Sequence, residues 1–230
     1  MSIEKPRLHG SATEDSKAVS AWEAAYERFE TPAQEIAKFT ERLRWAGAES
    51  WPKEAAIVEL FCGRGNGLTA LAGLGFSNLI GVDISADLLK GYQGPGQVLQ
   101  ADCRKIPLPD ASADFVIVQG GLHHLPEMPG DFEQTLQEAR RLLKPGGRVF
   151  FVEPWLTPFL KFVHFVSFQP IVRRLSAKMD ALATMIEHER YTYEQWLGMP
   201  DKILALLNQY FTADRCVRNW GKIRFVGKAK

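Results

Sequence analysis

The sequence predicts an α/β fold, in which a mostly parallel β-sheet is covered by helices on both faces. From residue 55 onward, short apolar runs alternate with helical segments, and runs that are apolar throughout are typical of buried parallel strands. A loop with glycine at 63, 65 and 67 follows the first run. The second run ends on Asp83. These observations predict the fold class and the sheet edge at which a ligand would bind.

Two helices are expected before the sheet. Ser16–Phe29 and Pro32–Trp45 both show helical spacing, and Pro32 stands in a first turn, where proline is tolerated. Gly47 is expected to end the second helix. The preceding segment, Met1–Asp15, is polar, lacks the apolar core of a signal peptide and is expected to be a tail.

The expected sheet strands follow in chain order. They are Ala56–Leu60, Leu79–Val82, Gln97–Gln100, Phe115–Val118 and Arg148–Val152. A turn at Lys144–Gly147 is expected before the fifth strand, and the alternation stops after Pro154. Residues 155–200 then form an aromatic-rich helical insertion. Arg215–Trp220 and Ile223–Val226 are expected to pair as a hairpin that closes the sheet.

Composition describes an ordinary globular protein. Of the 230 residues, 46% are apolar and 24% charged, and the net charge of +1 gives no support for nucleic-acid binding. The three cysteines form no CxxC pair, so neither a disulfide framework nor a zinc site is expected, and a cytoplasmic setting is favoured. No apolar stretch has the length of a transmembrane helix.

The glycine loop and Asp83 together suggest a nucleoside site. Glycine lets the backbone approach a ligand closely, and the loop reads GxGxG because Leu68 stands where a dinucleotide motif has its third glycine. The alternative is a turn that only packs strand against helix. Asp83 suits a ribose diol; it could instead cap the next helix, although Ser85 is the better cap. Asp102 could accept a hydrogen bond from an adenine amine, or could be a surface carboxylate.

Five segments together resemble the successive motifs of the class I S-adenosylmethionine-dependent methyltransferases, on their small-molecule branch. They are Val58–Gly67, Gly81–Ser85, Ala101-Asp102 with the following Ile-Pro-Leu-Pro-Asp, Asp114–Val118 and Leu142–Gly147. The similarity covers roughly residues 55–153, in the order and spacing of the family. It implies a Rossmann-like, doubly wound, seven-stranded sheet with the last strand antiparallel and a helical insertion after the fifth strand.

The resemblance also implies a division of the chain into four segments. Residues 1–50 would form a helical lid, 51–154 the cofactor-binding core, 155–200 a substrate-recognition insertion, and 201–230 the last helix and the closing strands.

The resemblance further implies which residues meet S-adenosylmethionine or its product, S-adenosylhomocysteine. The expected contacts are Tyr26, Glu59, Phe61, Gly63, Gly65, Asp83, Ile84, Asp102, Cys103, Gln119 and Gly120. The methionine end would lie over Gly63 and Gly65, with Asp83 at the ribose and Asp102 with the Cys103 backbone at adenine. Phe61 departs from the family, which has glycine there. Tyr26 would close over the cofactor, or would only pack on the sheet.

His123 and His124 follow the fourth strand and are the candidates for proton transfer, because histidine titrates near neutral pH. A purely structural role is the alternative. The phenylalanines between Trp155 and Phe168 either pack in the core or form an apolar wall over the acceptor. Glu187–Tyr191 is interpreted as an ion-paired surface, and no metal site is expected.

The sequence thus predicts an enzyme that transfers a methyl group in line from S-adenosylmethionine to a small molecule, such as a sugar or a lipid-linked metabolite. No nucleic-acid partner and no membrane span are expected. Two alternatives stay open: a nicotinamide-dependent oxidoreductase, and a non-catalytic S-adenosylmethionine-binding partner protein.

Overall fold

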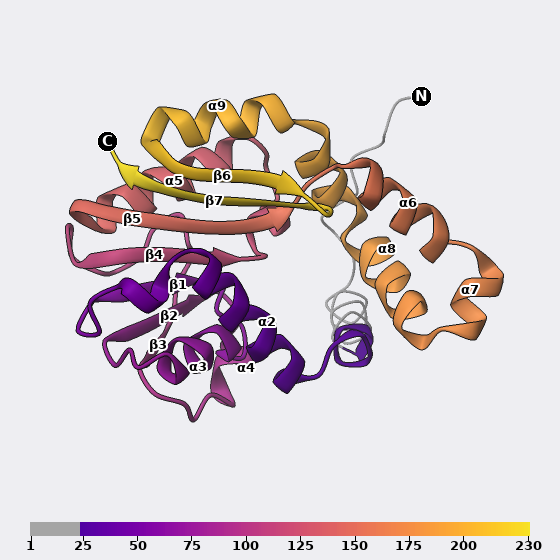
Figure 1. Ribbon diagram of the computed structural model, residues 1–230, viewed down its shortest axis with the longest axis horizontal. Helices are drawn as coiled ribbons and strands as arrows, with labels where there is room; N and C mark the ends of the chain where they lie inside the picture. The colour runs from indigo at the N-terminus through magenta and orange to yellow at the C-terminus, as the bar shows by residue number, and fades with distance from the viewer. Residues whose placement is uncertain (1–23) are drawn as a thin grey trace. The chain divides into compact units, whose positions relative to one another are not determined.

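The computed structural model describes residues 24–230, and a seven-stranded sheet is its central feature (Figure 1). The strands are β1 (Ile57–Leu60), β2 (Leu79–Asp83), β3 (Gln97–Gln100), β4 (Ala113–Gln119), β5 (Leu143–Pro154), β6 (Phe211–Asn219) and β7 (Lys222–Ala229). Their order across the sheet is β3-β2-β1-β4-β5-β7-β6. The chain separates into two compact units. Residues 32–162 with 191–230 form the sheet unit, and residues 24–31 with 163–190 belong to the other.

The predicted fold class is confirmed. Strands β1 to β5 pair in parallel, whereas β7 is antiparallel to both β5 and β6. Strand β5 begins earlier than predicted, at Leu143, and the expected turn is a bulge within it: Leu143 pairs with Ala113 and Arg148 with Phe115. Gly146, with φ of +83°, supplies the left-handed backbone that the bulge needs.

The helices alternate with the strands as expected. In chain order they are α2 (Pro32–Trp45), α3 (Asn66–Gly73), α4 (Ala86–Lys90), α5 (Gly130–Leu142), α6 (Pro158–Ser167), α7 (Pro170–Leu175), α8 (Ala177–Gly198) and α9 (Pro200–Tyr210), with short 3-10 turns η1 (Ala48–Ser50) and η2 (Leu122–His124). Residues 24–29 are also helical, while 16–23 of the first predicted helix lie outside the described residues. None of the helices described between residues 24 and 230 is long and apolar enough to cross a bilayer.

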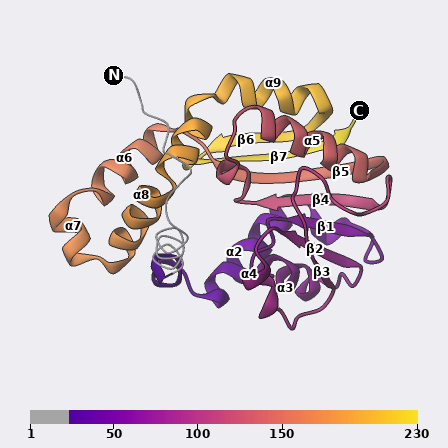
Figure 2. The ribbon, with the colours of Figure 1, turned by 180° about the vertical axis from the view of Figure 1, so that it is seen from behind.

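Each face of the sheet carries its own apolar core. Alternate residues of β4 point to opposite faces, as the strand period of two requires. Val116 and Val118 pack in the layer with α5 and α9, whereas Phe115 and Ile117 pack in the layer with α2 and α3. Figures 1 and 2 show α5 and α9 running along the part of the sheet that holds β5, β6 and β7. Two-sided burial explains why the strands read as uninterrupted apolar runs.

Arg141 at the end of α5 fastens the loop between β3 and β4. Its guanidinium donates to the carbonyl oxygens of Ile106 and Leu108, at 2.9 and 2.8 Å. It also pairs with Glu138 at 2.7 Å, and Glu138 accepts from the Ile106 N–H. Three partly buried polar groups of the loop and helix therefore depend on one side chain.

We expect Arg141→Ala to lower the free energy of unfolding by about 2–4 kcal/mol, because it removes the donor to two carbonyls and the ion-pair partner of the Glu138 carboxylate. The matched control is Arg140→Ala on the same helix, where the arginine is exposed and donates to the Lys230 carbonyl. That control should cost less than about 0.5 kcal/mol. Urea denaturation measures both changes, and equal losses in the two variants would contradict this role for Arg141.

Candidate active site

The candidate site lies where the carboxyl ends of β1, β2 and β4 meet. Strand β1 pairs with β2 on one side and with β4 on the other, so the order of strands reverses there. Open α/β sheets bind ligands in the crevice outside such a switch point. The glycine loop follows β1, Asp83 ends β2, and Gln119 ends β4. The fold thus brings together three segments that lie up to 60 residues apart in the sequence.

Asp83 joins the tips of the first two strands. One of its carboxylate oxygens accepts a hydrogen bond from the Gly63 N–H at 2.8 Å, and the other accepts from the Ser85 N–H at 2.9 Å. Ser85 itself caps α4 by accepting from the Leu88 N–H, as predicted. Asp83 is therefore not the cap. Each of its oxygens keeps a second lone pair that could accept from a hydroxyl.

The three glycines of the loop have different neighbours. Gly63 and Gly65 are both left-handed, with φ of +53° and +77°. A Cβ on Gly63 would meet no atom of the described residues within 4 Å, whereas one on Gly65 would strike the Tyr92 ring at 2.3 Å. A side chain on Gly67 would collide with the Glu59 carboxyl group at 1.8 Å. Of these three, only Gly63 borders open space.

Glu59 is a buried acid at the end of β1. Its Oε1 lies 3.5 Å from the Gln119 Nε2, and within residues 24–230 both its Oε2 and the Gln119 Oε1 are buried acceptors without a hydrogen-bond partner. Burial raises the pKa of the Glu59 carboxyl to about 8; the Gln119 hydrogen bond opposes this rise and the nearby Glu35 reinforces it. Two orphaned acceptors side by side form a place for a donor with several N–H groups, such as an ammonium.

Phe61 occupies the loop position at which the resembled family has glycine. Its φ is +57°, a left-handed conformation that is unusual for a bulky residue. Its side chain packs at the edge of the core and covers Gly121, where a Cβ would lie 2.2 Å from the Phe61 ring. The backbone can therefore make the family's turn because the ring is accommodated by a glycine after β4.

Asp102 forms an ion-pair network instead of standing alone. Both of its oxygens accept from the Nε and Nη2 of Arg104, and the third nitrogen of that guanidinium, Nη1, bonds Asp131 at 2.7 Å. These hydrogen bonds lower the pKa of Asp102. Cys103 beside it is buried, with its sulfur 3.6 Å from the Thr135 hydroxyl. An adenine contact at Asp102 would use the carboxylate lone pairs that do not accept from Arg104.

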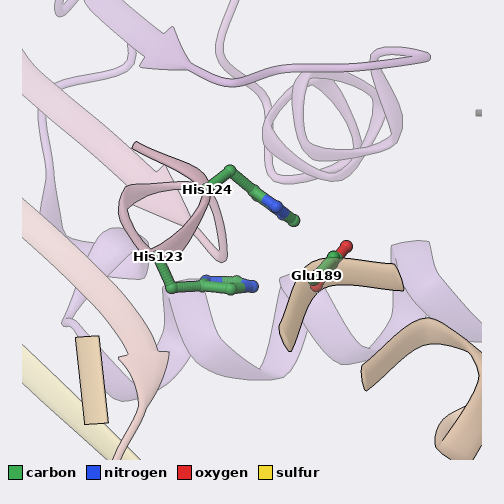
Figure 3. Close-up of side chains that lie close together, drawn as sticks. All are labelled: His123, His124 and Glu189. Carbon is green, nitrogen blue, oxygen red and sulfur yellow. The ribbon is translucent and has the colours of Figure 1, made fainter. Parts of the chain in front are cut away.

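His123 and His124 come from the η2 turn after β4, and Figure 3 shows both side chains. Their ring centroids lie 4.1 Å apart. His123 is buried, and its Nδ1 lies 2.7 Å from a carboxylate oxygen of Glu153 at the end of β5. The other oxygen of Glu153 accepts from the Gly121 and Leu122 N–H groups, each at 2.8 Å. A bond from Nδ1–H to the carboxylate makes Nε2 the basic nitrogen of His123.

His124 differs from its neighbour. Burial lowers the pKa of His124 well below its ordinary value, and the adjacent His123 adds to this effect. It is therefore neutral at physiological pH and a weaker base.

The remaining predicted contacts are spread over the two units. Ile84 follows Asp83 and is exposed, and Gly120 has a φ of +95°, where an added Cβ would have no atom of the described residues within 4 Å. Both lie at the switch-point edge. Tyr26 is half-buried and belongs to the other unit, so its contact with a ligand stays a prediction.

Sequence reasoning missed three side chains that shape this edge. Glu153 holds the η2 turn and His123, Glu35 of α2 accepts from the Asn66 amide at 2.6 Å, and Arg104 links Asp102 to Asp131. A carboxylate inside the apolar run Phe-Phe-Val-Glu-Pro was the available signal for Glu153. The other two pairings join residues 31 and 27 positions apart, which no local pattern reveals.

Comparison with known proteins agrees with this geometry. Residues 58–151 match the family model described as a methyltransferase domain. Demethylmenaquinone methyltransferase of Bacillus licheniformis is 29% identical over 140 residues, which cover 55% of this chain and 59% of that enzyme. A ubiquinone/menaquinone biosynthesis C-methyltransferase of Caulobacter vibrioides is 38% identical over 95 residues, or 39% of this chain and 36% of that protein.

A relative of a different kind also matches. Dimethylglycine N-methyltransferase of Parasynechococcus marenigrum is 30% identical over 138 residues, covering 55% of this chain and 48% of that enzyme. The chain thus spans between about one third and three fifths of these relatives.

Solved structures share the fold. A crystal structure of a Pyrococcus horikoshii protein has a TM-score of 0.64 at 21% identity, covering 90% of this chain and 97% of that one. A S-adenosylmethionine-dependent methyltransferase of Aquifex aeolicus has a TM-score of 0.53 at 16% identity, covering 94% and 98%. With the glycine loop, the acid at the tip of β2 and the order of the strands, these matches confirm the resemblance to the class I, S-adenosylmethionine-dependent methyltransferases: residues 58–151 match a methyltransferase domain, and the chain shares the fold of those solved structures.

Proposed function

We propose that this protein binds S-adenosylmethionine at the carboxyl ends of β1, β2 and β4 and transfers its methyl group to a small-molecule acceptor. The observation that carries the proposal is the Asp83 carboxylate, which accepts the Gly63 N–H at 2.8 Å and so holds an open glycine loop beside an acid. The methyltransferase-domain match over residues 58–151 favours this function over a nicotinamide-dependent oxidoreductase.

The residues present fit the cofactor. The orphaned acceptors of Glu59 and Gln119 suit the ammonium of its methionine end, and Gly63 leaves room for close approach. Asp83 retains lone pairs for the ribose hydroxyls. Asp102 and the Cys103 backbone are proposed for the adenine, with Ile84 and Gly120 at the rim. Phe61 contributes a wall at the edge of the core instead of an open glycine.

In the proposed reaction, the bound cofactor supplies an electrophilic methyl group on a sulfonium. The protein's own task is to align the acceptor in line with that methyl and to exclude water, which can contribute roughly 7–11 kcal/mol. Glu153 orients His123 and fixes its tautomer, so that Nε2 can take a proton from the acceptor. His124 is the second candidate for that role.

The acceptor is proposed to be a small organic molecule. Two of the relatives are named as a C-methyltransferase of ubiquinone and menaquinone biosynthesis and as a dimethylglycine N-methyltransferase, so a phenolic ring carbon and a tertiary amine are the first classes to test. The balanced charge of the chain offers no support for nucleic acid. The three cysteines are all free, which suits the proposed cytoplasmic setting.

The first test concerns Asp83. Asp83→Ala removes the acceptor of two backbone N–H bonds, and we expect it to weaken binding of S-adenosylhomocysteine by roughly 10- to 100-fold in titration calorimetry. Asp87→Ala is the control, because Asp87 lies four residues on, is exposed and pairs with the exposed Lys90. It should bind like the unmodified protein.

Release of S-adenosylhomocysteine from labelled S-adenosylmethionine, measured with a panel of phenols and amines, then separates an enzyme from a non-catalytic binder. If the unmodified protein bound neither compound, the proposed function would be wrong. Binding without turnover on any acceptor would favour the non-catalytic alternative.

A second test uses the titration of Glu59. With its pKa near 8, the free protein holds a proton on this group at pH 7, and an arriving ammonium favours the carboxylate. Binding should therefore release close to one proton at pH 7, and affinity should rise between pH 6 and pH 8. Calorimetry in buffers of different ionisation enthalpy measures the release.

Glu59→Gln should abolish the proton release, whereas the exposed Glu49→Gln should leave it unchanged. A pH-independent affinity in the unmodified protein would show that Glu59 does not meet the ligand.

The third test compares the two histidines. His123→Asn should lower kcat about 100-fold and flatten the acid limb of the pH–rate profile, with the affinity for S-adenosylhomocysteine unchanged. His124→Asn changes the adjacent histidine, whose pKa is lowered by burial. This variant should lower kcat less than His123→Asn does and should retain the acid limb of the pH–rate profile. Equal pH profiles in both variants would assign His123 a purely structural role.

A further inference from the structure

The segment that follows β5 exposes large apolar side chains. Phe162 and Phe165 on α6 are 64% and 67% exposed, and Ile171 and Leu175 on α7 are 69% and 81% exposed. Residues three or four apart share a side of a helix, so each helix carries a pair. Single exposed apolar residues are ordinary, but consecutive helices that carry them mark an interaction surface. These four side chains are not buried in either apolar core.

The same segment is strongly basic. Glu153 and Asp180 are the nearest acids on either side, and the residues between them include Lys161, Arg174 and Lys178, all exposed. Arg173 is also there but pairs with Asp180 at 2.9 Å and with Glu187 at 2.6 Å, so its charge is compensated. The whole chain, by contrast, balances 28 basic with 27 acidic residues. The charge is therefore local to the exposed apolar helices.

We propose that residues 155–179 dock the protein on an anionic lipid membrane surface. Helices that lie in the membrane interface combine exposed aromatic and aliphatic residues with lysine and arginine and have no need to span the bilayer. Helix α6 has 10 residues and α7 has 6, far fewer than the roughly 20 of a spanning helix. The proposal concerns association with the lipid surface and does not rest on binding of S-adenosylmethionine.

Charge favours lipid over a second copy of this chain. A two-fold dimer through this face would bring each protomer's basic residues against the same residues of its partner. Without acids in the segment, those charges would repel one another across a dry interface. An anionic headgroup layer, in contrast, attracts each exposed lysine or arginine and accepts the apolar side chains below it.

The test is flotation of the purified full chain with vesicles, without added cofactor. We expect binding to vesicles of phosphatidylcholine containing one third phosphatidylglycerol, and weaker binding to pure phosphatidylcholine or at high salt. Lys161→Gln with Arg174→Gln should lower the partition coefficient roughly 25-fold. Phe162→Ser with Phe165→Ser should lower it at least about tenfold.

The matched control is Lys105→Gln with Lys202→Gln, which removes two exposed charges outside the segment and should bind as the unmodified chain does. Each of these side chains is exposed, so thermal unfolding should confirm that all variants are folded. Failure of the unmodified chain to float with anionic vesicles would overturn the proposal. So would equal losses in control and segment variants, or a dimer in sedimentation equilibrium that Phe162→Ser with Phe165→Ser dissolves while flotation persists.

Discussion

The candidate site depends on the two hydrogen bonds that the Asp83 carboxylate accepts from backbone N–H groups. Neighbouring parallel strands exchange hydrogen bonds along their length, but the loops beyond their tips have no such ladder. Asp83 adds side-chain hydrogen bonds to the Cys62 N–H to Val82 carbonyl bond, because it accepts from the Gly63 N–H of the loop after β1 and from the Ser85 N–H that begins the next loop. Hydrogen bonds to a charged acceptor are stronger than neutral ones. One side chain thus holds two tips of the sheet in a fixed relation.

That fixed loop explains why its glycines are not equivalent. Gly63 adopts φ of +53° beside open space, which suits a ligand, whereas Gly65 is required by the Tyr92 ring and Gly67 by the buried Glu59 carboxyl group. The last glycine is therefore linked to the acid and not to phosphate recognition. The third glycine of the GxGxG pattern is explained by packing, because the buried Glu59 carboxyl group occupies the space that a side chain on Gly67 would fill at the start of α3.

The fold could be predicted from local sequence signals, whereas contacts between residues far apart in the sequence could not. The β3 and α2 boundaries agree with the sequence reading because apolar runs, a first-turn proline and a glycine stop are all local. Ser85 was recognisable as a cap for the same reason. Glu153 could not be assigned to His123, because their contact joins residues 30 positions apart. The sequence left open whether the α6 phenylalanines pack inside, since their spacing fits a buried or an exposed side equally.

Phe61 departs from the family pattern, which has glycine at this position, and its ring connects the loop after β1 with the turn after β4. A bulky residue in the left-handed region costs roughly 1–2 kcal/mol relative to glycine. Here the ring lies against the core and over Gly121, a position that could hold no Cβ. The Gly121 N–H in turn donates to Glu153, whose other oxygen holds His123. The loop after β1 is thus in contact with the turn that carries the proposed base, so a change at residue 61 would act on the acceptor side through packing.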